Sequence, residues 1–171
     1  MHAVGAADRP KPIHLLIEQT TAFKHLKSIA TSRLVKGRVL RDTLGPEGER
    51  EFERVLHEFL AEARGLGARP VLCTFATSHV RASLAKLPAE YELNLLRFNM
   101  DLSLLGWLDS IERYNRILER VAREENILCV DLASVLAGRS ELFRDFWHLK
   151  APGHEIAARS IADRLLEDSE R

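Results

Sequence analysis

Asp145 and His148 lie three positions apart near the carboxyl end of the chain, within the sequence LFRDFWHLKAPGH. An aspartate that accepts a hydrogen bond from one imidazole nitrogen fixes the tautomer of the ring. The other nitrogen is then free to act as a general base toward a hydroxyl nucleophile. The spacing also fits a simpler interpretation, in which Asp145 caps a turn and His148 packs beside Trp147.

The surroundings of this pair favour the catalytic interpretation. An apolar run over 127–132 predicts a buried strand before the pair, and Pro152 predicts the first turn of a helix over 152–167 after it. In α/β sheets, binding and catalytic residues gather at the carboxyl ends of the strands. The pair is therefore expected at that edge of a sheet.

The other elements predicted from the apolar spacing alternate between helix and strand. They are helices over 13–35, 47–64 and 110–125, a buried strand over 71–76, and a long loop with short helical turns over 77–108. Asp109 or Ser110 is expected to cap the third helix. This alternation is typical of an α/β domain with a parallel sheet flanked by helices.

The block around Asp145 and His148 resembles the last block of SGNH/GDSL-type esterases and lipases. In that family an aspartate and a histidine three residues apart precede a leucine, a Pro/Gly turn and a closing helix. Three earlier segments resemble the family in their order and spacing: Ala63–Thr74, Tyr114–Leu118 and Val130–Leu132. The similarity runs from Glu47 to Leu166, about 120 of the 171 residues.

The resemblance implies a fold, a reaction and two residue roles. The fold is the three-layer (αβα) flavodoxin-like SGNH hydrolase fold, and the reaction is hydrolysis of a small-molecule acyl ester through a serine ester intermediate. Asp145 would orient His148, which would take the proton of the serine and return it to the leaving alcohol. No metal ion or organic cofactor is implied.

The sequence departs from the family in two blocks. It contains neither the Gly-Asp-Ser block of the nucleophile nor the Gly-x-Asn-Asp block of the oxyanion hole. Both are expected before the helix over 47–64, where residues 1–12 instead predict a flexible lead-in. Residues 13–171 are therefore interpreted as one partial SGNH hydrolase-like domain, the C-terminal portion, with an unpaired sheet edge.

Ser78 is the candidate nucleophile within the chain. It follows the strand predicted over 71–76, so it is expected at the same sheet edge as Asp145 and His148. The alternative interpretation is that Ser78 is only the polar start of a loop. Three function classes stay open: an ester hydrolase, in a truncated or inactive form; one half of a split hydrolase; and a non-catalytic α/β protein that binds a partner.

The composition excludes several kinds of partner. The 25 Lys and Arg residues balance the 25 Asp and Glu residues, so no global field attracts nucleic acid or an anionic membrane. A signal peptide and a long apolar run are absent from the sequence, and Cys73 and Cys129 are predicted as buried free thiols, so a cytoplasmic location is expected. Two protein partners are compatible with the sequence: further copies of the chain in a homo-oligomer, or a complementing N-terminal half.

The positions of five further side chains predict their surroundings. Asn115 is expected to reach from its helix to a neighbouring connection. Trp107 and Trp147 either line a pocket or are simply buried. His57 is expected on a helix without a partner, and His154 is expected to face solvent.

Overall fold

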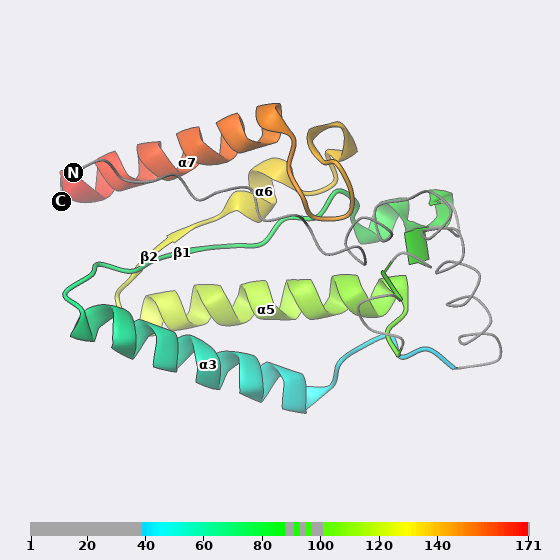
Figure 1. The fold of residues 1–171 in the computed structure, drawn as a ribbon, viewed down its shortest axis with the longest axis horizontal. Helices are drawn as coiled ribbons and strands as arrows, with labels where there is room; N and C mark the ends of the chain where they lie inside the picture. Colours follow the sequence, from blue (N-terminus) through cyan, green and yellow to red (C-terminus); the bar gives the residue numbers. More distant parts are fainter. Residues whose placement is uncertain (1–38, 88–90, 93–94, 97–100, 171) are drawn as a thin grey trace, which may run out of the picture.

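The computed structural model describes residues 39–87, 91–92, 95–96 and 101–170. Its main elements are helices α3 (Pro46–Gly65), α5 (Leu104–Glu124), α6 (Leu132–Leu136) and α7 (Ala151–Ser169), strands β1 (Val71–Cys73) and β2 (Leu128–Val130), and 3₁₀ helices η1 (Arg81–Lys86) and η2 (Ser140–Leu142). Figure 1 shows α3 and α5 on one side of the strands and α6 and α7 on the other. The predicted α/β class is confirmed. The lead-in over 1–12 and the helix over 13–35 lie outside the described residues.

The two strands of the described part of the chain pair in parallel, as predicted, with Leu72 opposite Cys129. Both are shorter than the predicted strands over 71–76 and 127–132. The ladder continues only to Thr74, whose N–H donates to the carbonyl of Val130 at 3.0 Å. Asp131 then becomes the N-cap of α6, because its side chain accepts a hydrogen bond from Ser134 N–H, and this ends β2.

Helix α3 confirms the helix predicted over 47–64. Pro46 occupies its first turn together with Glu47 and Glu49, where acidic side chains interact favourably with the helix dipole. The chain leaves the helix at Gly67, which has a φ of +73°. Only glycine adopts this left-handed conformation without strain, so the helix ends here and the chain turns toward β1.

Helix α5 begins earlier than predicted. It starts at Leu104, and its N-cap is Ser103, whose hydroxyl accepts a hydrogen bond from Gly106 N–H at 3.0 Å. The expected caps, Asp109 and Ser110, lie inside the helix. Gly106 makes the early start possible, because a Cβ at this position would lie 2.4 Å from the carbonyl oxygen of Arg41.

Asp109, which does not cap the helix, instead makes one ion pair within α5 and one that joins α5 to Arg81 of η1. Its carboxylate lies 2.6 Å from Arg113 and 2.8 Å from Arg81, and its side chain is 16% exposed. Burial by itself raises the pKa of Asp109, but the hydrogen bonds that the carboxylate accepts outweigh burial. The pKa of Asp109 is therefore below its ordinary value.

Replacing Asp109 by asparagine is expected to lower the free energy of unfolding by about 1–2 kcal/mol at pH 7. Because its pKa is lower in the folded than in the unfolded protein, the carboxylate stabilises the fold above the unfolded pKa. This contribution disappears as the pH falls through the folded pKa. Urea unfolding at neutral and acidic pH should therefore show a wild-type advantage that shrinks on acidification. Asp163→Asn, at an exposed position of α7, is the control.

The core of the described residues consists of three clusters. One lies between α3, α5 and the strands, and it contains Leu56, Leu60, Leu72, Ile117, Val121 and Ala122. The second contains Phe143 among its buried residues, and the third contains Phe146. The segment between these two phenylalanines is thus anchored at both ends, and this segment carries Asp145.

Candidate active site

Residues 143–149 form a closed loop that presents Asp145 and His148. Phe143 and Leu149 make an antiparallel bridge at its base. Arg144 N–H donates to the carbonyl of His148 at 2.7 Å, and Lys150 N–H donates to the carbonyl of Leu142 at 2.8 Å. The loop lies beside the segment that follows β1, beyond the carboxyl ends of the strands (Figure 1).

Asp145 and His148 are in direct contact within this loop. His148 Nδ1 lies 2.9 Å from Asp145 Oδ1 and 2.8 Å from Oδ2. The same carboxylate accepts hydrogen bonds from the backbone N–H groups of Trp147, at 3.1 Å, and His148, at 2.9 Å. Asp145 therefore fills both roles predicted from the sequence: it caps the turn, and it holds the imidazole ring.

The electrostatics of the pair favour an ionised carboxylate. Burial raises the pKa of Asp145, but the hydrogen bonds from His148 and Trp147 outweigh it and hold the pKa below its ordinary value. The side chains of His148 and Asp145 are 66% and 51% exposed, so both are accessible to a substrate. Within the described part of the chain, His148 Nε2 has no hydrogen-bond partner. This nitrogen is therefore placed to accept a proton.

Ser78 lies directly beneath the loop. Its backbone N–H donates to the carbonyl of Phe146 at 2.9 Å, so the backbone of Ser78 is joined to the loop that carries Asp145 and His148. However, Ser78 is only 1% exposed, and its hydroxyl is buried with no hydrogen-bond partner among the described residues. A nucleophile must reach the substrate, and in this arrangement the Ser78 hydroxyl does not.

His79, next to Ser78, also points into the protein. Its ring meets Tyr91 edge-on, with ring centroids 4.9 Å apart, and Nε2 is buried without a partner in the described residues. Burial lowers the pKa of His79, which favours the neutral ring. This histidine is therefore a structural neighbour of the loop rather than an accessible base.

Thr74 and Asp131 connect the carboxyl ends of the two strands, and the sequence did not single out either residue. Thr74 Oγ1 donates to Asp131 Oδ1 at 2.8 Å and accepts from Ala133 N–H at 2.8 Å. Thr74 is 2% exposed. The available signal was a polar residue within each predicted apolar run, Thr74 in 71–76 and Asp131 in 127–132. The pair fixes the sheet edge next to which the loop lies.

An apolar groove of about 590 Å³ lies beside β1 and reaches the loop at Trp147. Trp107 and Trp147 both line it, with ring centroids 5.5 Å apart, so of the two interpretations of this pair the structure agrees with the one in which they line a pocket. Asn115 also lines it and, as expected, reaches the connection after β1. Its side chain accepts from Phe75 N–H at 2.7 Å and donates to Phe75 C=O at 2.8 Å.

Two histidines and two cysteines differ in how well they agree with the predictions from the sequence. The prediction that His57 has no partner is wrong, because its Nδ1 lies 3.3 Å from Glu125, which α5 brings near α3. His154 is exposed, as expected. Cys73 and Cys129 are free thiols, but they are half-buried rather than fully buried. Burial raises the pKa of both, which makes them weak nucleophiles at neutral pH.

Comparison with known proteins gives no match: no family model, no curated protein and no solved structure is significantly similar to this chain. Over the described residues, no helix has the length and apolar character needed to cross a membrane. The same residues contain no group of three or more side chains from His, Cys, Asp and Glu that could hold a metal ion.

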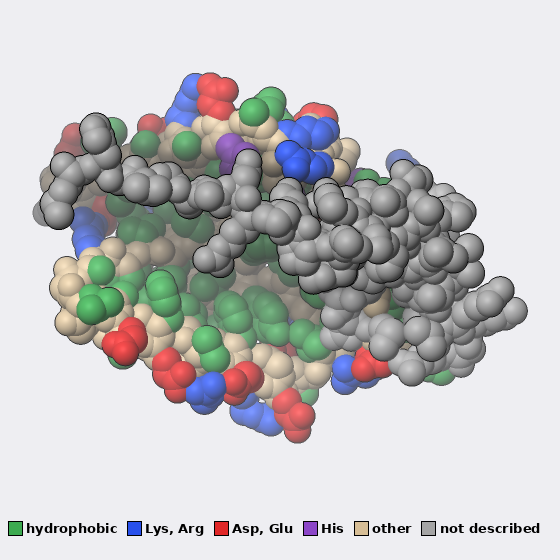
Figure 2. All heavy atoms as spheres, in the orientation of Figure 1, with side chains coloured by type: hydrophobic (Ala, Val, Ile, Leu, Met, Phe, Trp, Pro, Cys, Tyr) green, Lys and Arg blue, Asp and Glu red, His purple; other side chains and the backbone are tan. Residues whose placement is uncertain are grey.

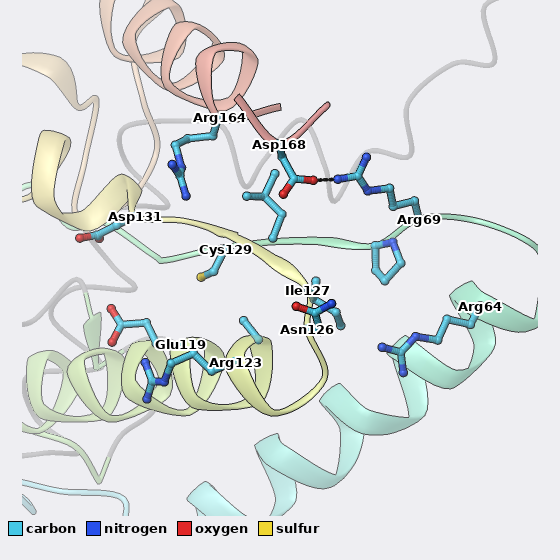
Figure 3. A pocket seen from close by; sticks show the side chains of 13 residues that line it. Arg64, Arg69, Glu119, Arg123, Asn126, Ile127, Cys129, Asp131, Arg164 and Asp168 are labelled. Atoms are coloured by element: carbon cyan, nitrogen blue, oxygen red, sulfur yellow. Dashed lines mark ion pairs between the residues drawn. The ribbon is translucent and has the colours of Figure 1, made fainter. Parts of the chain in front are cut away.

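A second hollow, of about 780 Å³, runs along β2 and is lined from α3, α5 and α7 (Figure 3). Four arginines line it: Arg64, Arg69, Arg123 and Arg164. Arg64 pairs with Glu125 and Arg69 pairs with Asp168. Exposed ion pairs of this kind contribute little to stability, and acidic side chains accompany the arginines, so the hollow is not a specific anion site.

Proposed function

We propose that the chain provides the acid and base residues of an ester hydrolase of the SGNH/GDSL type. The observation that supports this most directly is the contact between Asp145 and an accessible His148 whose Nε2 is free within the described residues. The carboxylate holds hydrogen on Nδ1, so Nε2 carries the lone pair that a general base needs. Together with this function we propose the three-layer (αβα) flavodoxin-like fold of that family.

The proposed reaction is transfer of an acyl group from an alcohol to water. His148 Nε2 takes the proton of a serine hydroxyl while the serine oxygen bonds to the ester carbonyl carbon. The protonated ring then gives this proton to the leaving alkoxide as the ester bond breaks. His148 Nε2 then takes a proton from water while the water oxygen bonds to the acyl carbon, and it returns this proton to the serine oxygen as the bond between serine and the acyl group breaks. Since the Ser78 hydroxyl is buried, we propose that the serine comes from a complementing polypeptide.

The test is hydrolysis of p-nitrophenyl butyrate by the purified chain and by its histidine variants. Even without a serine, an accessible imidazole base accelerates hydrolysis of such an activated ester. His148→Ala is expected to remove most of the protein-dependent rate, and His57→Ala, on α3, is the matched control. Equal rates in both variants would refute the role of His148. Labelling of Ser78 by a fluorophosphonate probe would show that the nucleophile lies within the chain.

The second candidate function is a non-catalytic protein that binds a partner, and the apolar groove beside β1 favours it. The described residues that line the groove carry no charge, and an apolar lining favours contact with an apolar surface of a partner. In that case Asp145 and His148 only stabilise their turn. A chain without esterase activity that binds a partner through the groove would favour this candidate over the hydrolase.

A further inference from the structure

The loop that carries the Asp145–His148 pair places Arg144 directly opposite His148. The antiparallel bridge between Phe143 and Leu149 sets this register, and Arg144 N–H donates to the carbonyl of His148 at 2.7 Å. Residues that lie directly opposite each other in an antiparallel pair have their side chains on the same face, with Cβ atoms about 4.5–5.5 Å apart. Arg144 and His148 are therefore side-chain neighbours.

Burial identifies the face of the loop on which these two side chains lie. Phe143 is 3% exposed, and it belongs to the second core cluster, against which Leu149 packs. Successive residues of an extended chain point to opposite faces, so Arg144 and His148 point away from this cluster. Both residues are exposed. A ligand that reaches the imidazole ring of His148 from solvent therefore meets the side chain of Arg144 beside it.

The charge of Arg144 is not cancelled by an acidic side chain of the described residues. The adjacent carboxylate, Asp145, is occupied by the ring of His148 and by two backbone N–H groups. Glu141, the acidic residue that precedes the loop, lies 3.4 Å from Arg139 instead. Arg144 makes no ion pair within the described part of the chain. Its guanidinium group is therefore available to a ligand.

A second cation adds to the positive potential around His148. Lys150 lies two residues further along, and its ammonium group donates to the carbonyl of Glu141 at 3.1 Å, a neutral partner that leaves its charge uncancelled. Residues 143–150 thus contain two cations and one carboxylate. Figure 2 shows Lys and Arg side chains on the surface where α7 begins, next to this loop. Such a potential attracts an anionic ligand to the loop.

We propose that Arg144 makes the proposed hydrolase specific for small esters that carry a carboxylate group. A guanidinium group matches the planar shape and the single charge of a carboxylate, and it can donate two parallel hydrogen bonds to it. The long side chain of Arg144 places this fork beside an ester held at His148 Nε2. The inference deepens the proposed function and rests on it, since the ester must react at His148.

The first test compares two esters that differ in charge, 4-acetoxybenzoate and its neutral methyl ester, with the purified full chain. The measured quantity is kcat/KM for the anionic ester divided by kcat/KM for the neutral ester, which removes effects common to both substrates. Arg144→Gln is expected to lower this ratio by about tenfold, because one charge-assisted contact is lost. Arg144→Lys keeps the charge without the planar fork, so it should retain part of the preference.

Arg159→Gln is the matched control for the loss of one positive charge. Arg159 lies on α7, and its side chain is 74% exposed, so this variant should keep the wild-type ratio. An equal fall of the ratio in Arg144→Gln and Arg159→Gln would mean that only the overall charge of the protein matters, and it would overturn the proposal. An unchanged ratio in Arg144→Gln would overturn it as well.

A binding measurement separates failure of this proposal from failure of the hydrolase. 4-Acetamidobenzoate has the same carboxylate with an amide in place of the ester, so it binds without rapid hydrolysis. Its titration should shift the NMR signals of the His148 ring, and Arg144→Gln should weaken the binding by about tenfold. Absence of these shifts would refute the site. Binding that depends on Arg144, in a chain whose His148→Ala variant hydrolyses esters at the wild-type rate, would support the carboxylate contact and refute the hydrolase.

Discussion

Replacing Asp145 by asparagine is expected to lower the rate constant of ester hydrolysis by about 10²–10⁴-fold. Asparagine has the same shape, and its side-chain oxygen can still accept the backbone N–H groups of Trp147 and His148. Its amide nitrogen, however, donates to Nδ1 of the ring. The hydrogen of His148 then moves to Nε2, which can no longer accept a proton from a nucleophile.

The measurement is the pH dependence of kcat and KM for hydrolysis of p-nitrophenyl butyrate by the purified chain. Asp145 acts through His148, so kcat should fall while KM and the thermal midpoint stay close to wild type. Asp163→Asn, at an exposed position of α7, controls for the loss of one negative charge. A fall in thermal stability with an unchanged kcat would instead mean that Asp145 only caps its turn.

Replacing Phe146 by alanine is expected to lower the free energy of unfolding by about 3–5 kcal/mol. Phe146 is 4% exposed and belongs to the core cluster with Leu95 and Leu108, so truncation leaves a cavity that the surroundings fill only in part. The alanine variant keeps the backbone carbonyl that accepts from Ser78 N–H, but it removes the side chain that anchors in the core the loop carrying Asp145 and His148.

Urea unfolding followed by tryptophan fluorescence measures this effect. A domain of this size has a total stability of about 5–15 kcal/mol, so the alanine variant can be largely unfolded. Phe146→Leu fills more of the space and keeps the variant measurable, with an expected loss of about 1–2 kcal/mol. Leu166→Ala, on the exposed side of α7, should change stability by less than about 0.5 kcal/mol. Equal losses for Phe146→Ala and Leu166→Ala would contradict the role of Phe146 as an anchor.

Helices whose apolar spacing is regular could be predicted from the sequence, and boundaries that depend on remote contacts could not. The spacing of Phe52, Leu56 and Leu60 defines α3, because a periodic apolar stripe is a local property. The start of α5 at Leu104 depends on the close approach of Arg41 to Gly106, which are far apart in the sequence. The early ends of both strands likewise depend on partners in other segments.

In the candidate site, too, a contact between residues close in the sequence could be predicted, and burial by distant segments could not. Asp145 and His148 are three residues apart, so a tight turn alone can bring them together, and their pairing could be anticipated. Ser78 was also expected close to them, but its burial could not be foreseen. Burial depends on how the 143–149 loop packs over the segment after β1, and no local pattern in the sequence carries that information.

The sequence by itself determined the α/β alternation, the parallel pairing and the Asp145–His148 block, because these follow from local periodicity and short spacing. The tertiary structure alone decided which groups are accessible. It left His148 exposed, buried the hydroxyl of Ser78, and placed an apolar groove beside β1. Accessibility depends on the packing of segments distant in sequence, and such packing is a property of the whole fold rather than of any one segment.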